Sequence, residues 1–320
     1  MNLQLRHAYS LFIPLLLLAS VFVAFQPSYA APQSQQNANT FSPGLQAQAE
    51  QDDAVAQYNL AQSYLRHDPT NDDYQSALKW LRASAAQGNA DAEFLLGYLY
   101  EHGQGVPCDY AKAAENYLAA ALQGHSTAEN NLASLYQHGQ GVPKNLSKAF
   151  EWYLASAQHG NPVGQCNLAT LYYLGSGIPR DYANAARWFR AAADAGSADA
   201  QNSLAVFYYK GVGVPLDYTE AARWVRLAAE CGLPTAETNL AYLYEQGRGL
   251  PLDYVAAYTW YSRALAAGDA SGANRRNQLS RLMTRKQLDE ATSLLATFSS
   301  EPQRQPSPAT GGTFSLLETH

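Results

Sequence analysis

The sequence has few charged residues and few cysteines for its length of 320 residues. Lys, Arg, Asp and Glu together make up 15% of the chain, and the formal net charge is −6. No cluster of Lys and Arg forms a basic stripe, so the composition argues against a nucleic-acid partner. The three cysteines, Cys108, Cys166 and Cys231, follow no common spacing. We therefore expect neither a disulfide framework nor a zinc site.

Long apolar runs are also scarce, and the one candidate lies near the N-terminus. Residues 11–25 are apolar and precede Ser28-Tyr29-Ala30, which matches a signal-peptidase cleavage pattern. As a helix this run would span about 22 Å, less than the ~30 Å hydrocarbon core of a bilayer. The sequence predicts a signal peptide cleaved after Ala30, with export to the periplasm or the cell exterior; a retained anchor is the alternative. We expect no membrane span in the mature chain.

What the sequence does contain is a repeat with a period of 36 residues. One glycine of the repeat recurs as Gly105, Gly141, Gly177, Gly213 and Gly249. Leucine and tyrosine keep the same step as Leu60, Leu96, Leu132, Leu168, Leu204 and Leu240, and as Tyr64, Tyr100, Tyr136, Tyr172, Tyr208 and Tyr244. All five tryptophans share one position, where Asn116 is the exception: Trp80, Trp152, Trp188, Trp224 and Trp260. A fixed period of this length indicates stacked supersecondary units, and the repeated leucines and tryptophans are predicted to be buried between helices.

The segment from Leu168 to Gly196 predicts the local structure of each unit. Its apolar residues recur at helical spacing on both sides of a turn that contains Gly175 and Gly177. Gly175 is expected to end the first helix in the left-handed conformation, and Asp181 to cap the second helix. The predicted fold is therefore an all-α solenoid of six helix-turn-helix repeats, followed by a pair of capping helices.

The repeats predict five segments along the chain. Asn89, Asn161, Ser197 and Asp269 are expected to cap first helices, and Thr284 to open the last helix with a capping box. The leader and the tail are rich in polar residues and proline, a composition typical of flexible chain. The segments are a signal peptide (1–30), a flexible leader (31–51), six repeats (52–269), capping helices (270–297) and a disordered tail (298–320).

The repeat pattern A-(E/Q)-x-N-L-A-x-L-Y-x-x-G-x-G-V-P-x-D-Y-x-x-A-x-x-W-Y-x-x-A-A-x-x-G, which stands here over residues 236–268, resembles the Sel-1-like repeat, a relative of the tetratricopeptide repeat. The resemblance implies a right-handed superhelix of antiparallel helix pairs. It also implies an exported bacterial scaffold, not an enzyme, that binds a protein or peptide in envelope assembly, signalling or host contact. A structural subunit of an envelope polysaccharide or secretion complex is an alternative role. We expect a monomer.

First-helix positions that vary between repeats are the candidates for partner binding. They lie at offsets 0, 4 and 7 within each first helix, so they share one helix face. In a tetratricopeptide-like stack the first helices line the concave face. A mildly polar, tyrosine-rich groove favours an extended peptide or a partner's loop; a solvated face with no dedicated partner is the alternative. The candidate groove residues are Tyr58, Phe94, Tyr98, Glu101, Asn130, Ser134, Gln137, Thr170, Tyr173, Asn202, Tyr209, Thr238, Tyr242 and Glu245.

Signals for catalysis or metal binding are weak. Ser76 and Lys79 match the S-x-x-K signature of penicillin-recognising serine enzymes, but the companion S-D-N and K-T-G motifs are missing from the sequence. The scattered histidines lie in hairpins expected to be about 10 Å apart, too far for shared zinc ligation. We therefore expect no catalytic residues, no cofactor and no metal. A hydrolase acting on β-lactams or peptidoglycan is the enzymatic alternative.

Overall fold

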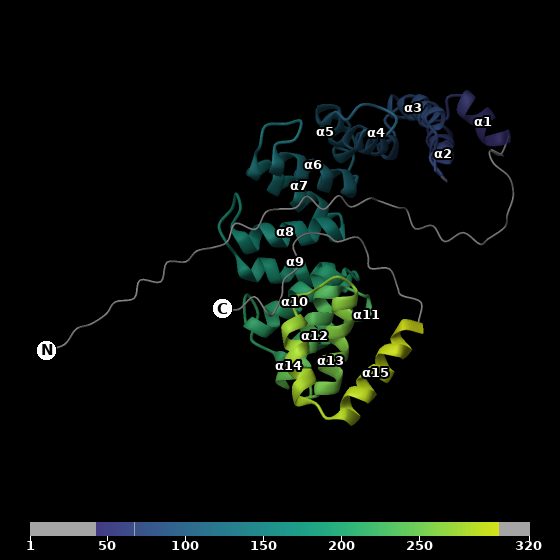
Figure 1. Ribbon diagram of the computed structural model, residues 1–320. Helices are drawn as coiled ribbons and strands as arrows, with labels where there is room; N and C mark the ends of the chain where they lie inside the picture. Colours follow the sequence, from purple (N-terminus) through teal and green to yellow (C-terminus); the bar gives the residue numbers. More distant parts are fainter. Residues whose placement is uncertain (1–42, 67, 301–320) are drawn as a thin grey trace. The chain divides into compact units, whose positions relative to one another are not determined.

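The structure, a computed structural model, describes residues 43–66 and 68–300 (Figure 1). The expected signal peptide lies outside this part of the chain. Within it, every regular element is an α-helix: α1 (Pro43–Glu50), α2 (Ala54–Tyr64), α3 (Asn71–Ala85), α4 (Ala90–His102), α5 (Tyr110–Ala121), α6 (Ser126–His138), α7 (Leu146–Gln158), α8 (Pro162–Leu174), α9 (Tyr182–Asp194), α10 (Ala198–Lys210), α11 (Tyr218–Glu230), α12 (Pro234–Gln246), α13 (Tyr254–Ala266), α14 (Ala273–Leu282) and α15 (Arg285–Ser300).

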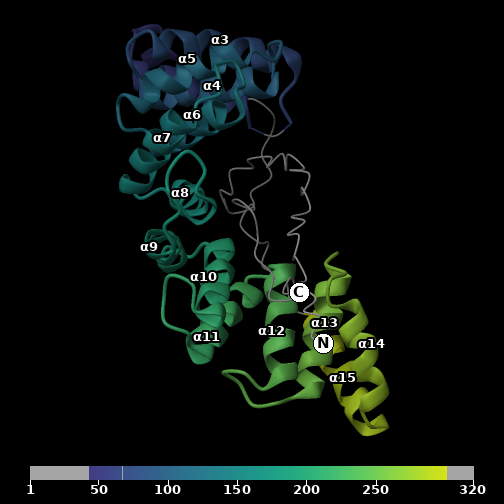
Figure 2. The same ribbon diagram turned by 90° about the vertical axis from the view of Figure 1, so that its left-hand side faces the viewer.

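The helices form consecutive hairpins, and each hairpin packs on the next (Figures 1 and 2). The six hairpins run from α2/α3 to α12/α13, and α14 and α15 both pack on α13. No hairpin can bury its apolar face alone, so each depends on its neighbours. The predicted all-α solenoid with a C-terminal helix pair is confirmed.

Each turn within a hairpin is set by one glycine and one capping side chain. In the α8–α9 turn, Gly175 has a φ of 72° and its N–H bonds the carbonyl of Leu171. Asp181 then accepts a hydrogen bond from the backbone N–H of Asn184 at 2.9 Å. These contacts satisfy backbone groups that a helix end leaves open, as the sequence predicted.

The predicted caps of the first helices are confirmed at three positions and wrong at one. Asn89, Asn161 and Ser197 each accept a hydrogen bond from the following helix. Asp269 does not cap α14, which begins only after Gly272. A side chain at Gly272 would meet the ring of Tyr261 at 2.3 Å, so the backbone passes close to this ring where α14 begins. The Asp269 carboxylate instead accepts from the Thr238 hydroxyl at 2.7 Å.

The flexible leader is corrected in its described part. Residues 43–50 form helix α1, and Ala49 is buried beside Ala56 and Leu60 of α2. The side-chain amide of Gln57 donates to the Ala49 carbonyl at 3.1 Å. The small apolar face of α1 covers an apolar surface of α2 that would otherwise be exposed. The polar composition of this segment did not predict this packing. The remainder of the leader lies outside the described residues.

The C-terminal helices extend slightly beyond the expected boundary. Gln287 and Thr284 form the predicted capping box, with Gln287 N–H donating to Thr284 Oγ1 at 3.3 Å and Thr284 N–H to Gln287 Oε1 at 2.9 Å. Helix α15 continues to Ser300 because Phe298 packs against Trp260, with ring centroids 5.7 Å apart. The rest of the predicted tail lies outside the described residues.

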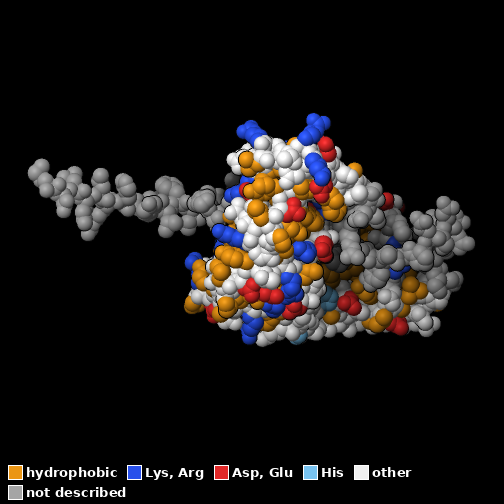
Figure 3. All heavy atoms as spheres, turned by 90° about the horizontal axis from the view of Figure 1, so that it is seen from below, with side chains coloured by type: hydrophobic (Ala, Val, Ile, Leu, Met, Phe, Trp, Pro, Cys, Tyr) orange, Lys and Arg blue, Asp and Glu red, His pale blue; other side chains and the backbone are white. Residues whose placement is uncertain are grey.

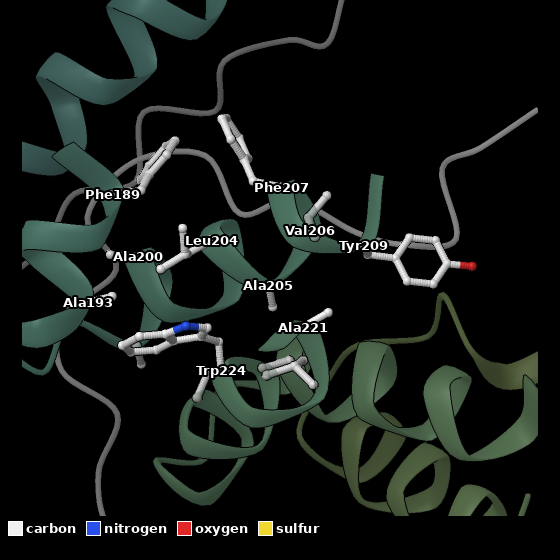
Figure 4. Packing of buried hydrophobic residues seen from close by; sticks show 14 of the residues in the cluster. Phe189, Ala193, Ala200, Leu204, Ala205, Val206, Phe207, Tyr209, Ala221 and Trp224 are labelled. Carbon is white, nitrogen blue, oxygen red and sulfur yellow. The ribbon is translucent and has the colours of Figure 1, made fainter. Parts of the chain in front are cut away.

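The apolar core lies between successive hairpins. In the largest cluster, from α8 to α12, the rings of Phe189 and Phe207 pack at 5.4 Å next to Leu204 (Figure 4). The repeated leucines are buried as predicted. Among the tryptophans, only Trp224 is fully buried, at 3% exposure. The others are half-buried, and in several repeats a basic side chain covers the ring, as Arg187 covers Trp188 at 5.1 Å from the ring centroid.

Candidate functional site

The fourteen candidate groove residues lie on the first helices α2, α4, α6, α8, α10 and α12, and we call them the first-helix face. Contacts between these helices show that successive members are neighbours. Asn167 donates to Asn130 at 2.8 Å between α8 and α6, and Asn239 donates to Asn202 at 2.8 Å between α12 and α10. The structure therefore brings the first helices of successive repeats together, and each bond joins a face residue to the neighbour of its equivalent in the next repeat.

Burial within the first-helix face is uneven. Asn130, Asn202, Tyr209 and Thr238 are buried, whereas the other ten residues are half-buried. The asparagine and threonine side chains make polar contacts between repeats, because a buried polar group needs a partner. Their variation in sequence therefore reflects, in part, the packing of neighbouring hairpins.

Three acidic or amide residues of the face act as acceptors for buried tyrosines. Glu101 accepts from the Tyr117 hydroxyl at 2.5 Å. The same bond recurs in two other hairpins, from Tyr153 to Gln137 at 2.9 Å and from Tyr261 to Glu245 at 2.8 Å. Burial raises the pKa of all three tyrosine hydroxyls, so they stay protonated donors.

In two of the remaining hairpins the first helix carries the tyrosine. Where the second helix carries Phe189 or Val225 in place of tyrosine, the first helix carries Tyr173 or Tyr209. Three pairs thus hold a matched donor and acceptor, the pair of Tyr173 and Phe189 holds two aromatic rings, and Tyr209 faces Val225; the first repeat has neither arrangement. The sequence contained this signal, but it becomes visible only when the two positions are compared with each other.

At the C-terminal end of the face, two arginines pack on tyrosine rings. The Arg248 guanidinium donates to the Tyr209 hydroxyl and lies 5.5 Å from the Tyr209 ring centroid and 5.3 Å from that of Tyr218. The Arg275 guanidinium lies 4.8 Å from the ring of Tyr242. We call these five residues the arginine–tyrosine cluster.

The cluster is held together by further polar contacts. The Tyr209 hydroxyl donates to that of Tyr242 at 3.5 Å, and Arg275 pairs with Glu245 at 3.1 Å. Burial raises the pKa of Tyr209 to about 12. Sequence reasoning missed Arg248 and Arg275 because the first lies in a turn and the second lies beyond the repeats. Arginine and tyrosine are the residue types that most often dominate protein interfaces.

The N-terminal part of the face is aromatic and carries histidines. The ring of Phe94 stacks on His125 with centroids 4.6 Å apart, and Tyr98 stacks on His102 at 4.0 Å. His102 Nδ1 also lies 2.9 Å from the Tyr98 carbonyl oxygen. This end of the face thus offers flat apolar surfaces, and the other end offers arginine donors.

The catalytic and metal signals gain no support from the geometry. Lys79 is exposed, and its ammonium lies 4.7 Å from the Trp80 ring centroid. Within 43–66 and 68–300, no group of three or more His, Cys, Asp or Glu could hold a metal ion. No disulfide joins any of the three cysteines, all of which are described.

The surface shows no segregation of charge on the face seen in Figure 3, where basic, acidic and hydrophobic side chains are interspersed. None of the helices in the described part combines the length and the apolar character needed to cross a membrane.

The paired helices and their regular junctions define an α/α helical-repeat protein. The family model described as "Sel1 repeat" matches six times, and the chain belongs to the Sel1 repeat family. Sel1 repeats generally mediate protein interactions and are generally non-catalytic scaffolds. The matched residues are 54–89, 90–125, 126–161, 162–197, 198–233 and 234–269.

Two solved structures are similar in both sequence and fold. One is c5321, "a protective antigen present in uropathogenic Escherichia coli strains displaying an SLR fold", with 31% identity, a TM-score of 0.73 and 81% of this chain covered. This chain spans only 57% of the length of c5321. The other is a Sel1 repeat protein from Oxalobacter formigenes, with 31% identity, a TM-score of 0.62, and coverage of 69% of this chain and 88% of that chain. No curated protein matches the sequence.

Proposed function

We propose that the protein is an exported, non-enzymatic scaffold that binds an extended peptide or a partner's loop along the first-helix face. The arginine–tyrosine cluster is the observation that carries this proposal. It holds two guanidinium groups on rigid aromatic rings, and such rings lose little conformational entropy when a partner binds.

The two ends of the face favour a peptide of mixed character. Near α4, Phe94 and Tyr98 offer apolar rings, which suit an aliphatic or aromatic side chain. Near α12, Arg248 and Arg275 offer donors, which suit carboxylates or backbone carbonyls. We therefore propose a partner segment with apolar residues at one end and acidic residues at the other.

Export rests on the predicted signal peptide, which lies outside the described residues. The likeness to c5321, described as a protective antigen of uropathogenic Escherichia coli, is consistent with this part of the proposal. Cell fractionation with an antibody to the mature chain tests this part. Recovery of the full-length chain only from the cytoplasm would contradict it.

The binding proposal is tested in two steps. Crosslinking in the native cell, followed by mass spectrometry, identifies the partner, and calorimetry with the purified pair gives Kd. We expect Tyr98→Ala and Tyr242→Ala each to weaken binding at least tenfold, because both half-buried rings lie on the face. Tyr209 is only 8% exposed, so the variant used at this position is Tyr209→Phe, which removes the hydroxyl and keeps the packed ring.

The matched control is Leu252→Ala, which removes an exposed apolar side chain that belongs neither to the first-helix face nor to the arginine–tyrosine cluster. It should leave Kd unchanged. Equal affinity of both tyrosine variants and the control would show that the partner binds elsewhere.

A further inference from the structure

A half-open cavity of about 210 Å³ lies between the second helix of one repeat and the start of the next. Helix α5 contributes Ala114 and Leu118 to its wall, and the next repeat contributes Leu132, Tyr136 and Val142. None of these belongs to the first-helix face. The wall is therefore mostly apolar and separate from the candidate site above.

At most other junctions, a large side chain of the second helix packs against the next repeat's tyrosine. At three junctions an arginine donates a hydrogen bond to the hydroxyl of this tyrosine: Arg82 to Tyr100, Arg190 to Tyr208 and Arg226 to Tyr244. At the α7–α8 junction, Phe150 packs on Tyr172, with centroids 5.6 Å apart and the rings at 88°.

The junction between α5 and α6 lacks both solutions. Ala114 stands at the position of Phe150, and Leu118 stands at the position of the arginines. Leu118 remains 37% exposed. The cavity is therefore the space that a phenyl ring fills one repeat further along the chain.

The size and character of the cavity fit such a ring. An apolar cavity of about 150 Å³ stays dry and binds benzene. The present one is larger and is open on one side, so a side chain can enter from solvent. Glu115 is the one ionisable side chain in its wall besides Tyr136, so an acidic neighbour on the ligand would be repelled.

We propose that this cavity binds the side chain of a phenylalanine in a partner peptide whose flanking residues are neutral or basic. The phenyl ring lies at a steep angle to Tyr136, as Phe150 lies to Tyr172. The neighbouring Lys148 ammonium is 5.0 Å from the Tyr136 ring centroid, and Lys148 is not among the residues that line the cavity. This site is independent of the first-helix face and of the function proposed for it.

The experiment uses two blocked peptides, Ac-Lys-Gly-Phe-Gly-NH₂ and the same peptide with alanine in place of phenylalanine. Binding to the mature chain is followed by methyl NMR, because a phenyl ring shifts methyl signals beside it. We expect saturable shifts at Leu118, Leu132 and Val142 with the phenylalanine peptide alone. Equal shifts with the alanine peptide, or saturation without shifts at these methyls, would overturn the proposal.

Two variants test the cavity, one by filling it and one by opening an equivalent cavity in the next repeat. Ala114→Phe supplies the ring from within, in the geometry of Phe150, and should reduce affinity at least tenfold while the melting temperature stays unchanged or rises. Phe150→Ala should open an equivalent cavity beside Tyr172, giving a second set of shifts at Leu168 and Ile178. Unchanged affinity in Ala114→Phe would refute the site, and a folded Phe150→Ala without new shifts would refute its derivation.

Failure here is distinguishable from failure of the first-helix face. Tyr98→Ala and Tyr242→Ala should leave the NMR response to the phenylalanine peptide unchanged, because neither residue borders the cavity. Loss of that response in both variants would assign the peptide to the first-helix face.

Discussion

Glu237 is a buried carboxylate whose ionisation should oppose folding near neutral pH. Its side chain, on α12, is only 3% exposed and pairs with Arg263 at 2.8 Å. Its Oε2 has no hydrogen-bond partner in the described part of the chain. Burial raises the pKa of Glu237 from 4.5 to about 7, with a smaller contribution from Asp269, and the pairing with Arg263 offsets this only in part.

The sign and size of the effect follow from this pKa. Between pH 4.5 and pH 7 the folded chain binds more protons at Glu237 than the unfolded chain does. The stabilising contribution of protonated Glu237 is therefore complete below pH 4.5 and is lost as the pH rises through 7. At about 1.4 kcal/mol per pKa unit, Glu237 contributes a loss of about 3 kcal/mol once it is ionised.

The change Glu237→Gln removes the pH dependence of stability that this side chain causes. Other repeats already carry glutamine at this position. Gln165 and Gln201 occupy the same position in other repeats, where their amides donate to the carbonyls of Ala157 and Ala193 at 3.3 Å. The new amide can donate to the equivalent carbonyl and still accept from Arg263. We expect the stability advantage of the variant over wild type to grow from less than about 1 kcal/mol at pH 5 to about 3 kcal/mol at pH 8.

The assay is urea denaturation followed by circular dichroism at pH 5, 6, 7 and 8. The control is Glu220→Gln, because a surface hydrogen bond from Arg223 lowers the pKa of Glu220 and places its titration below this range. The control should keep the wild-type slope. Parallel stability curves for wild type and Glu237→Gln across pH 5–8 would refute the reasoning.

Three further changes test the fold by thermal melting. Gly141→Ala should destabilise the fold strongly, because φ is 69° and the new methyl would lie 2.2 Å from the Tyr110 backbone. In Gly160→Ala the new methyl meets no atom within 4 Å, so this change should cost only about 1 kcal/mol of backbone strain. Equal melting temperatures for the two variants would contradict this. Tyr153→Phe should cost about 1 kcal/mol through loss of its buried hydrogen bond, and an unchanged melting temperature would show that the bond adds nothing. Trp188→Ala should cost about 3 kcal/mol, because the ring packs against two core clusters, and a stable variant would count against that packing.

The repeated parts of the fold were predictable from sequence because their causes are local. A glycine that ends a helix and an aspartate that caps the next act within a few residues of each other, as Gly175 and Asp181 do. The fixed leucines needed only the period of the pattern. Helix α1 was missed because its burial depends on the open end of α2, which no local pattern reveals.

The candidate site was less predictable because its side chains act in pairs. Glu101 was selected as a groove residue from its variation alone, yet it accepts a hydrogen bond from Tyr117 on the facing helix. Arg275 joins the cluster from α14, outside the repeat, where no internal comparison reaches. The assignment of the whole face to a partner remains a prediction.

The tyrosine of each first helix gives successive hairpins a common surface, while the residue that meets it changes from Arg82 to Phe150 along the chain. After removal of one whole repeat, every second helix would therefore still pack against a first helix that carries this tyrosine. Excision of residues 90–125 would place Leu78 and Arg82 against Tyr136, and excision of 126–161 would place Ala114 and Leu118 against Tyr172. Such an array can gain or lose whole repeats by recombination without requiring a new type of contact between hairpins.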